Sequence, residues 1–343
     1  MKSLKYILLA ILGLGLFFSC DREYSDFQGD EMAKFNAWIQ VKNIPAEALK
    51  PSGLYYISNQ EGTGLSPEKG DFLVYSIKEK SLSGYVYFSN EYVTAKLYDN
   101  FDINFHFGPL FTKYEINRDY NAVEGYPINS VSLLMVKGVY EGLSYMKEGG
   151  KATLIMPSKL AYGRSGLTYS QTTRISPYES LIYEVELIKV VKDPRAYENE
   201  LLQTYVNTNY PGLEMVNDSI YYVQLSPPTV DTVTVAKDSI VYVYFKGKLL
   251  NGYVFDTNID SVAKKLGRTF SSTDSLTVTI GKEVIKGFSL ALTQMKKGEW
   301  GRAIIPSYSG YDSIAQKSIP PFSTLIYDIY FVDKEIVPAP KSK

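Results

Sequence analysis

Residues 136–158 read VKGVYEGLSYMKEGGKATLIMPS, and residues 285–307 read IKGFSLALTQMKKGEWGRAIIPS. Three landmarks recur in the two stretches: an aliphatic residue before Lys-Gly, the string Met-Lys-x-Gly, and Pro-Ser. All three are displaced by 149 positions (285 minus 136). Chance does not keep a displacement constant across three landmarks, so the chain contains two copies of one domain.

The repeat continues in both directions with a changed displacement. Downstream, ISP at 175–177 and LIY at 181–183 return 144 positions later as IPP and LIY, so one connection is shorter by five residues in the second copy. Upstream, GYV at 84–86 returns 168 positions later, so the first copy carries 19 extra residues in its middle. The differences between the copies are therefore the evidence for function.

The N-terminus has the pattern of an export signal. Lys2 and Lys5 precede the apolar stretch 6–18, which is too short for a comfortable membrane span. Cys20, the only cysteine of the chain, follows this stretch and resembles the lipobox of bacterial lipoproteins. We predict lipidation at Cys20, which anchors the chain to a lipid membrane. The alternative is a misread signal with an unmodified thiol.

Composition bounds the partners and the compartment. The formal net charge is -1, and removal of Lys2 and Lys5 with the signal makes it -3. A slightly acidic chain is a poor candidate for binding nucleic acid, so we expect no nucleic-acid partner. We expect the cell envelope as the location, with the anchor in the outer membrane on its periplasmic or surface face. The 30 tyrosines favour half-buried strands.

Two stretches outside the copies have helical spacing. Apolar residues at 31–42 suggest a short amphipathic helix, and Asp193-Pro194 is a typical start for a helix over residues 193–210. Strand patterns occupy 72–77 in the first copy and 239–245, 276–280, 300–305 and 324–331 in the second. The expected organisation is a signal at 1–19, a lipidated tether with a short helix at 20–50, a first domain at 51–192, a helical connector at 193–212, a second domain at 213–335 and a tail at 336–343.

Five short motifs of the second copy resemble FKBP-type peptidyl-prolyl isomerases in order and spacing. They are Tyr244-Phe245-Lys246-Gly247, the string GYVFD at 252–256, GKEVIKGF at 281–288, MKKG at 295–298 and IPP at 319–321. The first copy shows the same skeleton at 136–138, 141–143, 157–158, 160–163 and 175–177. The chain thus resembles tandem domains of this family, in a bacterial lipoprotein of the Bacteroidetes type.

The resemblance implies an α+β fold made of two FKBP-like domains. Each is a half-barrel of antiparallel strands around a short helix, beginning near Gly138 in the first copy and near Gly287 in the second. An apolar pocket between helix and sheet suits prolyl isomerisation, which needs no nucleophile, metal or cofactor. The sequence agrees with that requirement, because its one histidine, His106, and one cysteine cannot form a triad or a Cys/His metal cluster.

The resemblance also assigns site residues in the second copy. The Ile285 N–H is expected to bind a substrate carbonyl, Phe288 to form the pocket floor and Tyr311 to donate a hydrogen bond. For each apolar residue the alternative is ordinary core packing, and for Asp256 it is a turn residue. The expected catalytic residues are Phe255, Asp256, Ile285, Phe288, Tyr311 and Tyr327, and the expected substrate-binding residues are Phe245, Leu276, Val284 and Ile319.

The first copy departs from this pattern. Aligning the GYV strings places Tyr87 opposite Phe255 and Phe88 opposite Asp256, so the acidic residue is missing. We therefore expect a degenerate binding or structural module in the first copy. Its pocket positions are Ile77, Tyr87, Val136, Val139, Tyr162, Ile175 and Tyr183.

Two functions compete on this evidence. One is a membrane-anchored prolyl isomerase and folding helper, acting on proline-containing protein clients, with its activity in the second copy. The other is a noncatalytic binding or envelope-assembly lipoprotein with the same folds. A glycan-binding lipoprotein is a third reading, favoured only by the abundance of tyrosine.

Overall fold

The computed structural model describes residues 26–99, 101–115, 135–168, 173–229, 235–270, 272–282, 284–316 and 318–332. The chain divides into two compact units, residues 1–43 and 44–343, and each is described by itself. The predicted signal, Cys20 and the tail at 336–343 lie outside the described residues.

The described part of the first unit is dominated by helix α2 (Phe27–Val41). The helix predicted at 31–42 is confirmed, and it begins four residues earlier. It starts there because the side chain of Asp26 accepts a hydrogen bond from the Gly29 N–H at 2.9 Å, which satisfies one of the free donors of the first turn.

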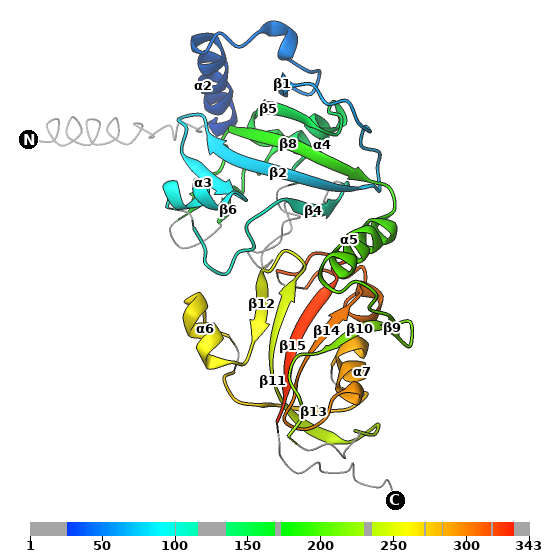
Figure 1. Cartoon of the computed structure of the whole chain (residues 1–343). Coiled ribbons are helices and arrows are strands. Elements are labelled where there is room, and N and C mark those ends of the chain that lie inside the picture. The colour runs from blue at the N-terminus through cyan, green and yellow to red at the C-terminus, as the bar shows by residue number, and fades with distance from the viewer. Residues whose placement is uncertain are drawn as a thin grey trace, which may run out of the picture. The chain divides into compact units, whose positions relative to one another are not determined.

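The second unit holds two main antiparallel sheets, one in each copy (Figure 1). The sheet of the first copy, here called domain 1, has the strand order β1-β5-β8-β2-β3, with β4 paired to β2. A separate pair is formed by β6 and β7. The strands of domain 1 are β1 (Tyr55–Gln60), β2 (Phe72–Ser81), β3 (Val86–Ser89), β4 (Leu110–Lys113), β5 (Gly150–Met156), β6 (Leu167–Thr168), β7 (Arg174–Ile175) and β8 (Leu181–Val191).

The sheet of the second copy, here called domain 2, has the order β12-β11-β15-β14-β10-β9, with β13 paired to β11. Its central strands therefore follow the same order as those of domain 1. The strands of domain 2 are β9 (Met215–Val216), β10 (Ile220–Gln224), β11 (Ile240–Leu249), β12 (Val254–Thr257), β13 (Leu276–Thr279), β14 (Trp300–Ile305) and β15 (Leu325–Phe331).

Strand register confirms that the two domains are copies at the level of single residues. In domain 1, Glu79 on β2 pairs with Tyr183 on β8. The same position of domain 2 is Gly247 on β11, which pairs with Tyr327 on β15. Both hairpins also shift register at this place, between Glu79 and Lys80 and between Gly247 and Lys248. A residue of one domain can therefore be compared directly with its equivalent in the other.

One short helix packs on each sheet, as predicted. Helix α4 (Lys137–Ser144) packs on β5, and α7 (Lys286–Gln294) packs on β14 and β10 (Figure 1). Both begin within one residue of the glycines at which we predicted them. Each domain buries its own apolar core. The predicted α+β class with antiparallel sheets is confirmed. The other short helices of the described residues are α3 (Tyr92–Leu97), α6 (Asp260–Leu266), η1 (Ala46–Ala48), η3 (Ser158–Leu160) and η4 (Ser307–Ser309).

The predicted helical connector is present as α5 (Pro194–Asn209), and Asp193 caps it through bonds from the N–H groups of residues 195 and 196. It does more than join two domains. Leu202 and Val206 are buried in one cluster with residues of β10, β14 and β15, so α5 is packed on the sheet of domain 2. This face of that sheet is the one opposite the core, because its buried residues alternate with those of the core.

Candidate active site

Four aromatic rings of domain 2 meet around Tyr327 of β15. Its ring centroid lies 5.9 Å from that of Phe245, 5.6 Å from that of Phe255 and 5.0 Å from that of Phe288. Phe245 and Phe288 also contact each other edge to face at 6.0 Å. The four rings come from β11, β12, α7 and β15, so strand pairing and helix packing bring together residues that we predicted to share a pocket.

Gly247 makes this aromatic cluster possible. A Cβ atom at position 247 would lie 2.6 Å from Cε2 of Phe255 and 2.9 Å from Cε1 of Tyr327. Both distances are shorter than real Cβ contacts, so the two rings rest on the bare backbone of β11. Gly247 stood in one of the motifs, but we did not predict this role.

Polar groups lie beside the rings. Asp256 is partly buried on β12, and its Oδ1 accepts a hydrogen bond from the Thr257 N–H at 2.9 Å. Burial raises the pKa of Tyr311, its hydrogen bond with Tyr327 lowers it, and the charge of Asp256 raises it, with a net increase. The predicted site therefore brings Tyr311, Tyr327 and Asp256 within electrostatic reach of one another.

The pKa of the neighbouring tyrosine is raised as well. Burial raises the pKa of Tyr327 well above its usual value, and the charges of Tyr311 and Asp256 and the bond with Tyr311 raise it further. Both hydroxyls therefore carry their protons at neutral pH and can donate a hydrogen bond to a ligand.

Ile285 stands at the start of α7, as its N-cap residue. Its carbonyl accepts bonds from the N–H groups of Phe288 and Ser289. Among the described residues, no backbone carbonyl accepts the Ile285 N–H. An N–H at this end of a helix is directed away from the helix and carries part of the positive end of its dipole, so it suits a carbonyl oxygen.

The other predicted residues of domain 2 occupy different depths. Ile319 is buried in the core cluster, and Val284 packs against that cluster while remaining partly exposed. Leu276 is the first residue of β13, pairs with Val243 and is 37% exposed. Leu276 thus lies outside the buried cluster that holds the four rings.

All seven residues predicted for the degenerate pocket of domain 1 are buried in its core. The hydroxyl of Tyr183 lies 3.4 Å from that of Tyr162, which matches the Tyr327 and Tyr311 pair of domain 2. Unlike the aromatic site of domain 2, this pocket also contains two carboxylates. Tyr183 donates a hydrogen bond to Glu79, which is fully buried, and Tyr87 donates one to Glu179. We did not predict either carboxylate.

An asparagine holds the same strand in both domains. Asn90 Oδ1 accepts a hydrogen bond from the Ile77 N–H at 2.8 Å, and Asn258 Oδ1 accepts one from the Phe245 N–H at 2.7 Å. The two asparagines are 168 positions apart, the displacement of the upstream repeat, so the sequence contained a signal for this shared bond. Each fixes the strand that carries a wall residue of the pocket.

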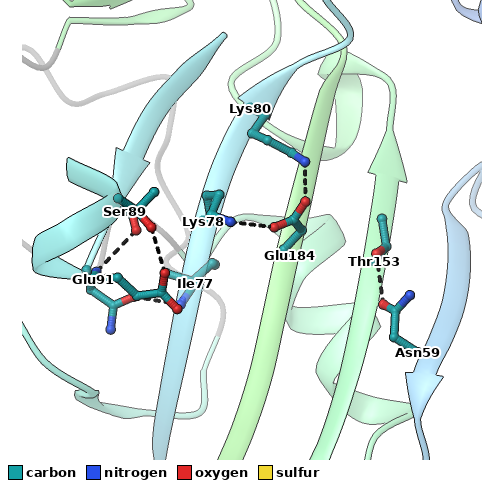
Figure 2. A network of polar contacts seen from close by, with 10 residues as sticks. Asn59, Ile77, Lys78, Lys80, Ser89, Glu91, Thr153 and Glu184 are labelled. Atoms are coloured by element: carbon teal, nitrogen blue, oxygen red, sulfur yellow. Dashed lines mark hydrogen bonds and ion pairs between the residues drawn. The ribbon is translucent and has the colours of Figure 1, made fainter. Parts of the chain in front are cut away.

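A separate cavity of about 340 Å³ lies on the outer face of the domain 1 sheet. Among the residues that line it, Lys78 of β2 pairs with Glu184 of β8, which also binds Lys80, and Asn59 accepts a bond from Thr153 at 2.8 Å (Figure 2). Burial raises the pKa of Glu184, but the bonds and charges of the two lysines outweigh it and lower the pKa overall. The cavity is therefore lined by paired charges and differs in kind from the aromatic site of domain 2.

Among the residues that the structure describes, no group of three or more His, Cys, Asp or Glu side chains could hold a metal ion. No helix in the same part of the chain has the length and apolar character needed to cross a membrane.

The sequence family FKBP-type peptidyl-prolyl cis-trans isomerase matches residues 105–188 and 231–332. These two segments make up more than half of the chain and fall in the two domains. The chain therefore belongs to the FKBP-type peptidyl-prolyl cis-trans isomerase family.

Individual relatives cover parts of the chain. FK506-binding protein 4 of Chaetomium thermophilum is 40% identical over 101 residues, 29% of this chain and 18% of that protein. The FKBP-type peptidyl-prolyl cis-trans isomerase FkpA of Buchnera aphidicola is 34% identical over 110 residues, 32% of this chain and 41% of that protein. The solved structure of the 3 FKBP domains of wheat FKBP73 is 19% identical, covers 84% of this chain and 96% of that chain, and has a TM-score of 0.31. The chain thus spans less than half the length of these two curated relatives.

Proposed function

We propose that this protein is a membrane-anchored peptidyl-prolyl cis-trans isomerase and folding helper, with its activity in domain 2. The observation that carries the proposal is the cluster of four aromatic rings around Tyr327, with the Ile285 N–H and the Tyr311 hydroxyl as its polar groups. Domain 1 assists as a binding or structural module.

The proposed chemistry requires no bond to an enzyme group. The barrier to rotation about an X-Pro bond is about 20 kcal/mol and arises from amide resonance, which the bond loses as it twists. Water stabilises the charge-separated, planar form of the amide. An apolar aromatic site withdraws that solvation and so favours the twisted form. Each reduction of the barrier by about 1.4 kcal/mol increases the rate tenfold.

The polar groups have separate roles in this mechanism. The Ile285 N–H binds the carbonyl of the substrate residue beyond the proline and fixes the chain on one side of the twisting bond. The Tyr311 hydroxyl, which lies beside Tyr327, donates a hydrogen bond to a substrate carbonyl. Burial raises the pKa of both tyrosines, and the charge of Asp256 raises it further, so both hydroxyls are protonated when substrate binds.

The test is the rate of cis-to-trans conversion of a short peptide with leucine before proline, catalysed by residues 21–343. We expect acceleration that falls at least tenfold in Phe255→Ala and in Asp256→Ala. The matched controls are Tyr87→Ala and Phe88→Ala, which change the equivalent positions of domain 1 and should leave the rate unchanged. A wild-type rate equal to the uncatalysed one would refute the enzymatic proposal.

One observation favours the noncatalytic alternative. Phe245, Phe288 and Tyr327 are only 9%, 3% and 6% exposed, so their own rings fill much of the site. A domain of this kind could bind proline-containing segments without turning them over. Saturable binding of a proline-containing peptide, together with an isomerisation rate equal to the uncatalysed one, would establish that alternative.

The anchor and the clients are the remaining parts of the proposal. Lipidation of Cys20 is supported by its position after the apolar stretch at residues 6–18. Growth with an alkyne-tagged fatty acid should label the wild-type chain and leave Cys20→Ala unlabelled. Proline-containing proteins of the envelope are the proposed clients, and membrane fractionation of both chains tests the proposed envelope location.

A further inference from the structure

The two domains differ sharply in chemistry at the equivalent positions 79 and 247. Glu79 faces Phe88 on β3 and Tyr183 on β8, whereas Gly247 faces Asp256 on β12 and Tyr327 on β15. The register is the same on both sides of each strand. One domain therefore has a carboxylate side chain where the other has no side chain at all.

The space over Gly247 is already used by the rings of Phe255 and Tyr327. An added Cβ would lie 2.6 Å from the first ring and 2.9 Å from the second. A glutamate at position 247 would therefore displace two of the four rings that form the proposed prolyl site. The aromatic site and a glutamate at this position exclude each other.

In domain 1 the glutamate occupies the site. Glu79 is fully buried, and its carboxylate accepts a hydrogen bond from the hydroxyl of Tyr183, which lies 3.4 Å from the hydroxyl of Tyr162. These two tyrosines are the equivalents of Tyr327 and Tyr311. The Glu79 side chain thus extends from β2 to the tyrosine pair that forms the polar edge of the site in domain 2.

Tyr87, the equivalent of Phe255, contacts different residues. Tyr87 donates to Glu179 and contacts Tyr85 edge to face at 5.0 Å. Burial raises the pKa of Tyr87, and so do its bond to Glu179 and the charges of Glu179 and Glu79. Both carboxylates therefore lie close to this ring.

We propose that Glu79 is an internal plug, which fills the prolyl site of domain 1 and restricts X-Pro segments to domain 2. A prolyl ring is apolar and gives the buried carboxylate no hydrogen bond. Binding it would therefore break the hydrogen bond between Tyr183 and Glu79 without replacing it. Residue 79 or 247 is therefore one determinant of the specificity of each domain for prolyl segments. The inference uses the proposed function only to define which site is the prolyl site.

The test is photolabelling of residues 21–343 with a proline tetrapeptide that carries a diazirine, followed by mass spectrometry of the labelled segments. In the wild type we expect label in domain 2 and none in domain 1. Glu79→Gly should raise the label in domain 1 at least tenfold, while label and isomerase rate in domain 2 stay unchanged. Glu79→Gln keeps the bulk and the bond from Tyr183, so its domain 1 should remain unlabelled.

Glu79→Ala is the second opening variant, because alanine disturbs the strand backbone less than glycine does. Thermal unfolding and near-UV circular dichroism identify which of the two variants is folded. Label in domain 1 of the wild type or of Glu79→Gln would overturn the plug, and so would a folded opening variant without label there. Absence of label in domain 2 would instead refute the proposed function, so the two failures are distinguishable.

Discussion

Glu198 of α5 accepts two hydrogen bonds from Ser307, one from its backbone N–H at 2.6 Å and one from its hydroxyl. A third comes from the Thr324 hydroxyl at 2.8 Å. Ser307 opens η4, and the chain leaves η4 toward Tyr311. The helix that precedes domain 2 therefore holds the segment that carries a proposed substrate-binding hydroxyl.

Glu198→Ala should destabilise domain 2 by about 3 kcal/mol, because it leaves three buried donors without their charged acceptor. Urea unfolding checks this in a Trp38→Phe background, where Trp300 on β14 reports on domain 2 alone. The control is Arg195→Ala on the same helix. Its ion pair with Asp312 is exposed, so it should cost less than about 1 kcal/mol. Equal losses in the two variants would contradict the role of Glu198.

The same variant separates positioning from stability. If Glu198 holds the segment of Tyr311, Glu198→Gln should keep most of the stability, because an amide oxygen still accepts from Ser307. Isomerase kcat/KM should then fall less in Glu198→Gln than in Glu198→Ala. A loss of kcat/KM in the folded Glu198→Ala protein, measured well below its unfolding temperature, is the readout that a purely structural role would not give.

The repeat was predicted where the two copies have identical residues, and it was missed where only the structural role of the residues is the same. Asp26 and Asp193 both cap helices and lie 167 positions apart. The buried residues follow the same displacement, as Glu31, Phe35 and Ile39 in α2 and Glu198, Leu202 and Val206 in α5. The repeated unit thus begins with a helix. The shared features are a capping aspartate and, five residues later, a buried glutamate. A comparison of residue identities alone does not reveal that these two positions have the same structural roles.

The candidate site, like the repeat, was predictable only in part. Phe245, Phe255 and Phe288 stood in motifs with a known order, and the structure brings their rings together around Tyr327 of the repeated LIY string. Tyr311 was assigned from the resemblance, outside those motifs. Gly247 and Glu79 were not predicted, because their meaning depends on which residues face them across the sheet. Strand register decides that pairing, and a single sequence does not give the register.

Gly247→Ala should lower both activity and stability, because the new methyl group meets the rings of Phe255 and Tyr327. Overpacking of this kind costs about 1–3 kcal/mol and moves the rings out of the site. Peptide isomerisation and urea unfolding measure the two effects. Leu276→Ala is the comparison, since that side chain is 37% exposed and should cost less stability. Full activity in Gly247→Ala would exclude the proposed close contact of rings and backbone.

Tyr311→Phe should reduce kcat/KM about tenfold or more, because it removes the proposed donor to the substrate carbonyl. Tyr327→Phe should reduce it less, since the Tyr327 side chain is only 6% exposed and its hydroxyl is not the proposed donor to substrate. Both pKa values lie above the usual value of 10 for tyrosine, so the hydroxyls stay protonated from pH 7 to about pH 9. The rate should therefore be constant over that range. A fall centred below pH 10 that Tyr311→Phe abolishes would contradict this assignment.

Asp328 should make domain 2 sensitive to acid. Arg302 binds both oxygens of its carboxylate, at 2.5 and 3.0 Å, and Lys246 lies 3.0 Å away. Burial raises the pKa of Asp328, but these bonds and charges outweigh burial and hold it below the ordinary 3.8. A lowered pKa stabilises the fold above the pKa of the unfolded chain, and this contribution is lost as pH falls through the folded value.

Asp328→Asn should therefore cost about 3 kcal/mol at pH 7, and its deficit against the wild type should shrink as the pH falls below 3.8. Urea unfolding at a series of pH values measures that difference, followed through Trp300 for this variant and through far-UV circular dichroism for the control in domain 1. The matched control is Glu184→Gln, at the equivalent position of domain 1. The Glu184 side chain is 39% exposed, so solvent screens its bonds to Lys78 and Lys80, and its loss should cost less than about 1 kcal/mol. A deficit of Asp328→Asn that is the same at every pH would show that packing, and not the charge of Asp328, holds this part of the sheet.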